Sequence, residues 1–194
     1  MHARAAICGG IRSNMTETSV ALGHPAAFLD RDGVINVDVG YPHRIDTFRF
    51  IPGAPEAIRA LNQAGLRVVV VSNQSGVAKG MFTEDTVRLF NQHIADNLAR
   101  HDARIDAFYF CPYHPDAVVE RYRADHPERK PHPGMITRAA REMNLDLTRS
   151  FLIGDRDTDI QAATAAGIPG YLFKGDNLFS FLNGIPSQTF CQHV

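Results

Sequence analysis

The hydrophobic positions of this chain form short runs that alternate with longer segments of helical spacing. The runs have the length of strands and cover residues 26–29, 66–72, 105–110, 151–154 and 171–173. The segments of helical spacing lie between them, at residues 55–64, 83–100, 134–144 and 158–166. This alternation predicts βαβ units, and therefore an α/β fold in which helices cover both faces of a central parallel sheet, a doubly wound three-layer sandwich.

The strand predicted at residues 66–72 has the clearest pattern. Residues 68–71 are all valine, with no polar residue among them. A run of β-branched residues without polar alternation is typical of a strand that is covered on both faces. We therefore expect this strand to be central in the sheet.

Residue types at the helix ends support the predicted boundaries. Pro55 lies in the expected first turn of one helix, and Gly65 follows its expected end. In the next helix, Glu84 and Asp85 follow Thr83, so their negative charges lie at the positively polarised N-terminus.

Three regions lack a sustained period. Residues 112–133 contain five prolines and are expected to leave the sheet as an irregular excursion. The segment from Lys174 onward is predicted to be an irregular tail, although Phe179, Phe181 and Leu182 have a spacing typical of core packing. Residues 1–23 are predicted to be a flexible tail that precedes one domain, residues 24–194.

Composition narrows the class of protein. Lys and Arg number 20 against 21 Asp and Glu, without a basic cluster, which argues against a nucleic-acid partner. The longest apolar run is too short to span a membrane, so we expect no membrane partner. Three widely spaced cysteines do not form a secreted disulfide pattern and suit the cytoplasm. A monomer that binds a small molecule is the expectation.

Acidic residues follow two of the predicted strands directly. Asp30 and Asp32 follow residues 26–29, with Gly33 available for a bend, and Asp155 and Asp159 follow residues 151–154. Ligands of open α/β sheets bind beyond the carboxyl ends of the strands, and carboxylate oxygens are preferred ligands of Mg²⁺. Taken singly, each acid could instead belong to a solvated turn or complement a helix dipole.

Polar and basic groups follow at two further places. Ser72-Asn73-Gln74-Ser75-Gly76 ends the predicted central strand, where hydroxyl, amide and backbone N–H groups can donate to phosphate oxygens. Arg129 and Lys130 precede the helix predicted at residues 134–144. An ordinary turn and plain surface charge are the alternatives for these two segments.

These four motifs, in their order along the chain from Asp30 through Ser72 and Lys130 to Asp155, resemble the haloacid dehalogenase superfamily of phosphatases. Residues 30–41 and 71–80 are most similar to the branch that contains the D-glycero-D-manno-heptose-1,7-bisphosphate 7-phosphatases, whose near relative is the histidinol-phosphatase. The resemblance extends over residues 26–173. It implies a hydrolase that forms an aspartyl-phosphate and uses Mg²⁺.

The resemblance also implies residue roles. Asp30 would be the nucleophile and Asp32 the general acid and base. Mg²⁺ would bind Asp30, the backbone carbonyl of Asp32 and Asp155, with Asp159 supporting the site. Ser72 and Lys130 would bind the transferring phosphoryl group. The remainder of the substrate would contact Asp38, Tyr41, Asn73, Gln74, Ser75, Arg129 and Arg156.

One motif of the branch is missing. Its members often hold a structural zinc ion with Cys-x-His and a later Cys-x-Cys, but here the second pair is replaced by His126-Pro127-Glu128. A site rebuilt from Cys111, His114, His126 and His132 is conceivable. We expect no structural zinc, because a closed zinc site normally keeps its sulfur-rich ligand set.

No insertion in the chain is long enough for a cap domain, so the loops at residues 34–50 and 112–129 should form the walls of an open site. We expect a phosphorylated sugar as substrate, with D-glycero-D-manno-heptose 1,7-bisphosphate, cleaved at its 7-phosphate, as the closest candidate. Histidinol phosphate, another small phosphate ester and an extended substrate are alternatives within enzymes. The alternative outside enzymes is a catalytically silent binding module with this fold.

Overall fold

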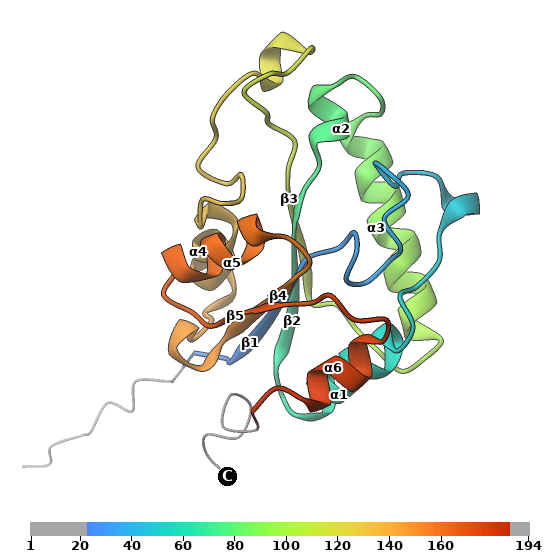
Figure 1. Ribbon diagram of the computed structural model, residues 1–194, viewed down its shortest axis with the longest axis vertical. Coiled ribbons are helices and arrows are strands. Elements are labelled where there is room, and N and C mark those ends of the chain that lie inside the picture. The colour runs from blue at the N-terminus through green and yellow to red at the C-terminus, as the bar shows by residue number, and fades with distance from the viewer. Residues whose placement is uncertain (1–22, 187–194) are drawn as a thin grey trace, which may run out of the picture.

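The computed structural model describes residues 23–186, and its core is one parallel sheet of five strands (Figure 1). The strand order is β3-β2-β1-β4-β5. Their bounds are β1 Ala26–Leu29, β2 Arg67–Asn73, β3 Ala107–Cys111, β4 Phe151–Gly154 and β5 Gly170–Leu172. Every neighbouring pair is parallel, as the sequence predicts. From β1 the chain adds β2 and β3 on one side of the sheet, and then crosses to add β4 and β5 on the other side of β1.

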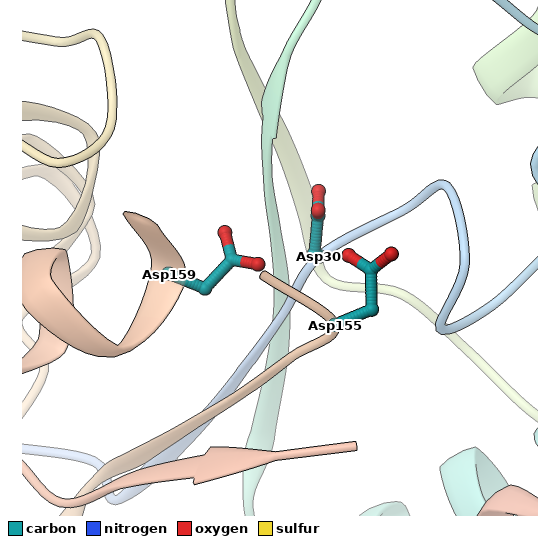
Figure 2. Close-up of side chains that lie close together, drawn as sticks. All are labelled: Asp30, Asp155 and Asp159. Atoms are coloured by element: carbon teal, nitrogen blue, oxygen red, sulfur yellow. The ribbon is translucent and has the colours of Figure 1, made fainter. Parts of the chain in front are cut away.

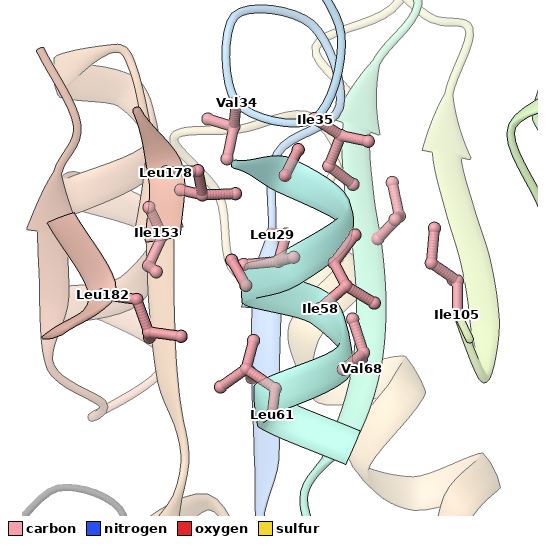
Figure 3. Packing of buried hydrophobic residues seen from close by; sticks show 14 of the residues in the cluster. Leu29, Val34, Ile35, Ile58, Leu61, Val68, Ile105, Ile153, Leu178 and Leu182 are labelled. Atoms are coloured by element: carbon pink, nitrogen blue, oxygen red, sulfur yellow. The ribbon is translucent and has the colours of Figure 1, made fainter. Parts of the chain in front are cut away.

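Helices cover both faces of this sheet. The helices are α1 Ala54–Gln63, α2 Ser75–Ala78, α3 Glu84–Ala99, α4 Gly134–Met143, α5 Asp157–Ala165 and α6 Leu178–Asn183. Buried side chains of α1, α3 and α6 form one hydrophobic cluster with the sheet, part of which Figure 3 shows. Those of α4 and α5 form another cluster on the opposite face (Figure 1). The predicted three-layer α/β sandwich is confirmed.

The strands divide their side chains between the two clusters. In β2, Val68 and Val70 belong to the cluster under α1, whereas Val69 and Val71 belong to the cluster under α4. Burial on both faces of this strand is therefore confirmed, and it accounts for the uninterrupted valine run. The middle of the sheet, however, is occupied by β1, with β2 beside it.

Two short helices differ from the sequence-based expectation. α6 lies where an irregular tail is predicted, and its Leu178 and Leu182 are buried in the cluster shared with α1. Phe181 makes a ring contact with Phe173, at 5.2 Å between centroids. The other, α2, was not predicted at all. Helices of four to six residues are unstable alone, so packing rather than local periodicity decides whether they form.

Besides isolated β-bridges, the long loops of the described chain contain short 3-10 segments. These are η1 Ile45–Thr47, η2 Glu120–Tyr122 and η3 Leu147–Arg149. Within residues 23–186 there is accordingly no separate cap domain. The excursion at residues 112–133 is tied to the body of the protein, because the backbone N–H groups of Val118 and Val119 both donate to Ala78 O at 3.0 Å.

None of the helices between residues 23 and 186 has the length and apolarity needed to cross a membrane. The predicted N-terminal tail lies outside the described residues except for Gly23, so the division into a tail and one domain stays a prediction.

Candidate active site

The candidate site lies at the carboxyl ends of β1 and β4, where the direction of strand order reverses. Asp30 follows β1 and Asp155 follows β4. Crevices at such switch points are the usual ligand sites of open α/β sheets. A cavity of about 480 Å³ opens here. Its lining includes every predicted catalytic and substrate-binding residue, namely Asp30, Asp32, Asp38, Tyr41, Ser72, Asn73, Gln74, Ser75, Arg129, Lys130 and Arg156.

Three carboxylates converge beneath this cavity. Figure 2 shows Asp30, Asp155 and Asp159 together, and each offers an oxygen within 4.8 Å of the others. Two glycines make room for them: a Cβ on Gly33 would collide with the Asp155 carboxylate, and a Cβ on Gly154 would collide with Asp159. Asp159, expected only to support the site, is thus a full member of the cluster.

Lys130 is the buried cation of this cluster, and the exposed Arg156 lies with its Nε 3.9 Å from Asp155 Oδ2. The buried ammonium of Lys130 lies 3.0 Å from Asp30 Oδ1 and 2.6 Å from Asp159 Oδ1, and it donates to Val71 O at 2.8 Å. The side chain of Asn73 binds the Lys130 peptide twice, donating to its carbonyl at 2.9 Å and accepting from its N–H at 3.0 Å. Asn73, predicted to contact substrate, therefore also fixes the backbone that carries the lysine.

Negative charge exceeds positive charge in the cluster, and the ionisation of its members reflects this. Burial, with the charges of Asp159 and Asp32, raises the pKa of Asp30 to about 7 despite the opposing effect of Lys130. Burial and Asp159 also raise the pKa of Asp155. Burial alone would lower the pKa of Lys130, but Asp30 and Asp159 raise it overall, so the ammonium form is kept.

The arrangement fits a hard divalent cation. Three carboxylates face one ammonium, and Asp155 Oδ1 is buried without a hydrogen-bond partner among the described residues. A buried polar oxygen without a partner is costly unless an ion or water satisfies it. Oxygen ligands at this spacing suit Mg²⁺.

Asp32 lies beside this cluster but has different partners. Its Oδ1 accepts from Arg31 Nε at 2.9 Å and from Asn36 Nδ2 at 3.0 Å. Its Oδ2 accepts from Arg31 Nη2 at 3.0 Å and from Gln74 Nε2 at 3.1 Å. The side chain of Asp32 keeps 15% of its surface exposed, toward the cavity.

Arg31 lies between Asp30 and Asp32 in the chain, and the sequence assigns it no role. Among residues 23–186 it is one of the largest fully buried side chains, at 1% exposure. A basic residue between two acids, directly after a fully apolar strand, could have indicated a buried arginine paired with one of them, because a buried charge must be paired.

Gln74 connects Asp32 to Ser72. Its Nε2 donates to Ser72 Oγ at 2.8 Å as well as to Asp32. Because Ser72 Oγ accepts this bond, its own hydrogen remains available to donate into the cavity.

The outer wall of the cavity is formed by the loop at residues 38–42 and by the excursion. Arg156 Nη2 contacts Asp38 Oδ2 at 2.9 Å, and the Lys79 ammonium contacts the Tyr41 hydroxyl. On the facing side, Arg129 Nη1 donates to Ser75 Oγ at 2.8 Å. Both predicted loops therefore contribute to the wall. Lining residues that the sequence did not assign to substrate are Gly40, Pro42, His114, Asp157, Thr158 and Asp159.

The residues considered for zinc have separate partners. Cys111 is fully buried in a hydrophobic cluster, and burial raises the pKa of its thiol to about 11. His126 stacks on Tyr113 at 4.2 Å between ring centroids, and His132 lies 3.1 Å from Asp125 Oδ1. Among residues 23–186, the carboxylate cluster alone meets the geometric requirement for a metal site. The expectation of no structural zinc stays a prediction.

Comparison with known proteins agrees with this geometry. A model of haloacid dehalogenase-like hydrolases matches residues 27–99, and a second, HAD-hydrolase-like model matches residues 128–177. A curated relative from Rhodopseudomonas palustris is 47% identical over 168 residues, which are 87% of this chain and 93% of the relative. That relative is a D-glycero-beta-D-manno-heptose-1,7-bisphosphate 7-phosphatase. The chain belongs to this branch of the haloacid dehalogenase-like hydrolases.

Solved structures of the same family superpose on the fold. A HAD-like phosphatase from Mesorhizobium loti has a TM-score of 0.75 and 41% identity, over 79% of this chain and 74% of that one. A D,D-heptose 1,7-bisphosphate phosphatase from B. bronchiseptica, solved with magnesium and phosphate, has a TM-score of 0.69 and 33% identity, over 84% and 88% of the two chains.

Proposed function

We propose that this chain is a magnesium-dependent phosphatase that removes the 7-phosphate of D-glycero-β-D-manno-heptose 1,7-bisphosphate. The observation that carries the reaction class is the convergence of three carboxylates and Lys130 at the switch point of the sheet. The 47% sequence identity to the Rhodopseudomonas palustris enzyme, over 93% of that enzyme's length, supports this substrate assignment.

Asp30 is the proposed nucleophile. One of its carboxylate oxygens attacks phosphorus, forming an O–P bond while the bond from phosphorus to the sugar oxygen breaks, so that one difficult hydrolysis becomes two easier displacements. Lys130, 3.0 Å from Asp30, and the Ser72 hydroxyl donate to the phosphoryl oxygens, on which the transition state spreads its charge.

Asp30, Asp155 and the backbone carbonyl of Asp32 would hold the metal ion, with Asp159 beside them. When bound, Mg²⁺ neutralises charge on the nucleophile and the phosphate, so that two anions can approach each other. The raised pKa values of Asp30 and Asp155 support this assignment, because burial and the neighbouring Asp159 carboxylate disfavour their charged forms until a cation binds.

Asp32 is the proposed acid and base. It gives a proton to the leaving sugar oxygen and later takes a proton from the water that attacks the aspartyl-phosphate, which releases inorganic phosphate and restores Asp30. Its place at the cavity wall, next to but outside the carboxylate cluster, supports this separation of roles.

The rest of the substrate would contact the outer wall. Arg129 and Arg156 offer planar guanidinium groups that suit the second phosphate, while Asp38 and Tyr41 face the sugar. All of these residues come from one chain, so we expect a monomer to be active. The buried Cys111 thiol is in keeping with a cytoplasmic protein.

The test is phosphate release from D-glycero-β-D-manno-heptose 1,7-bisphosphate, from its 1-monophosphate and from histidinol phosphate, each with and without Mg²⁺. We expect magnesium-dependent release of one phosphate from the bisphosphate and much slower turnover of the other two. Faster turnover of histidinol phosphate would make histidinol phosphate the assigned substrate instead. No turnover of any phosphate ester would favour a catalytically silent binding module.

A further inference from the structure

We propose that Arg31 is a positioning residue that holds the Asp32 carboxylate in place for both proton transfers. The inference rests on the proposed function, in which Asp32 is the acid and base. Arg31 itself is absent from the cavity lining, so it acts through its neighbour rather than on the substrate.

The contact between the two side chains fixes the orientation of the carboxylate. Arg31 Nε and Nη2 donate to the two oxygens of Asp32 at 2.9 and 3.0 Å, so each oxygen has its own donor. A paired contact of this kind sets the plane of the carboxylate as well as its distance, which a single ammonium donor cannot do.

The guanidinium is itself held from several sides. Nη1 donates to Asn91 Oδ1 of α3 at 3.0 Å, and Nη2 donates to Pro42 O at 3.0 Å. The guanidinium carbon lies 4.8 Å from the centre of the Phe90 ring. These contacts come from α3 and from the loop that forms the outer wall, so the position of Arg31 depends on both.

Arg31 also decides how Gln74 is oriented. Nη2 lies 3.1 Å from Gln74 Oε1, and a guanidinium can only donate, so the amide oxygen must face it. The amide nitrogen then points to Asp32 Oδ2 at 3.1 Å and to Ser72 Oγ at 2.8 Å. One buried arginine thereby orients the proposed acid and base directly, and the phosphate-binding hydroxyl through Gln74.

The test is Arg31→Lys, which keeps the charge and removes the paired contact. We expect kcat to fall about 100-fold, a typical share for general acid–base catalysis, while KM changes less than about threefold. The matched control is Arg67→Lys, at the opposite end of β2, where the arginine is paired with Asp106 at 3.0 Å. It should leave kcat unchanged.

A double-variant cycle separates positioning from general structural damage. In the Asp32→Asn background, Arg31→Lys should lower kcat by less than about twofold more, because the group that it positions is already lost. Binding of Mg²⁺ and inorganic phosphate, measured by calorimetry, should persist in both single variants. Unchanged kcat in Arg31→Lys, or losses that multiply in the double variant, would overturn the inference.

Asn91→Ala serves if Arg31→Lys does not fold. Asn91 contacts the far side of the guanidinium, so kcat should fall a few-fold in the wild-type background and stay constant in the Asp32→Asn background. An equal loss in both backgrounds would overturn the inference. Failure of the proposed function looks different: either wild-type protein releases no phosphate, or Asp32→Asn retains full activity, and both results would also remove the basis for a role of Arg31.

Discussion

Asp30 and Asp32 stand two residues apart at the end of β1, and the tertiary structure surrounds them with opposite kinds of partner. Asp30 lies against two further carboxylates, with Lys130 as the adjacent cation. Asp32 accepts four hydrogen bonds, from Arg31, Asn36 and Gln74. The surroundings of Asp30 hold more negative than positive charge, whereas both oxygens of Asp32 accept hydrogen bonds from protein donors.

This difference shows how one residue type supports two chemical roles. Around Asp30, the missing positive charge must come from a bound cation or a proton. Activity and stability that depend on Asp30 should therefore respond strongly to Mg²⁺ and to pH. Around Asp32, the partners belong to the protein. Activity that depends on Asp32 should therefore respond to changes in packing and hydrogen bonding. The following predictions test whether the surroundings of Asp30 and Asp32 differ in this way.

The largest effect is expected for Asp30→Asn. The amide cannot attack phosphorus, so activity should fall by about 10⁴-fold or more, as for other essential nucleophiles. Phosphate release under saturating Mg²⁺ measures this. Asp46→Asn is the control, since that exposed carboxylate is paired only with Arg44 and should leave activity unchanged. More than a tenth of wild-type activity in Asp30→Asn would rule out the nucleophile assignment.

Lys130→Met should have the next largest effect, on stability. Removing the buried ammonium leaves Asp30 and Asp159 uncompensated, which should lower the free energy of unfolding by about 3–5 kcal/mol without metal. Because a bound cation supplies positive charge, Mg²⁺ should restore part of the loss. Urea unfolding with and without Mg²⁺ measures both. The exposed Lys79→Met should change stability by less than about 0.5 kcal/mol. Equal losses with and without Mg²⁺ would contradict a shared charge deficit.

The third prediction concerns pH. Folding raises the pKa of Asp30 from 3.8 to about 7, so the folded protein binds an extra proton between these values. Its contribution to stability is full below the lower value and is lost as pH rises through the upper one. The free energy of unfolding of metal-free protein should therefore fall by about 1–3 kcal/mol from acidic to neutral pH.

Urea unfolding across that range measures this slope, and Asp30→Asn should reduce it. Saturating Mg²⁺ is the internal control: protons and the cation compete for the same carboxylates, so Mg²⁺ affinity should rise over the same pH window. A Mg²⁺ affinity that does not vary with pH would show that the ion binds elsewhere.

The smallest effect is expected for Arg156→Gln. Its ion pair with Asp38 is 2.9 Å long, but the arginine side chain is 64% exposed, so stability should change by less than about 0.5 kcal/mol. We expect KM to rise a few-fold with kcat retained, because the variant loosens the outer wall and removes a cation from the cavity. Arg138→Gln on α4 is the control and should leave both constants unchanged. A large fall in kcat would place Arg156 in the chemistry instead.

Most of the fold could be predicted because its signals are local. A strand such as β4 is a short apolar run between polar residues, and α3 is capped by Thr83, whose hydroxyl accepts from Thr86 N at 3.2 Å. α6 could not be predicted in the same way. Its six residues depend on Leu178 and Leu182 meeting α1, which lies more than a hundred residues earlier in the chain.

The site divides along the same line. The sequence by itself determined that acids, hydroxyl groups and basic residues follow the strands, and parallel strands bring such residues to one edge of a sheet. Only the tertiary structure decided that Asp159 joins Asp30 and Asp155, that Asn73 holds the Lys130 peptide, and that Arg31 is turned inward onto Asp32.

The physical reason is that a charged side chain takes its role from its partners in space. Local sequence sets where Asp30 and Asp32 leave the strand and supplies Arg31 and Asn36 beside Asp32. The other partners come from segments between β2 and α5, namely Gln74, Lys130, Asp155 and Asp159. Those segments meet only after the sheet and its helices have packed, so the balance of charge around each carboxylate is set by the tertiary structure.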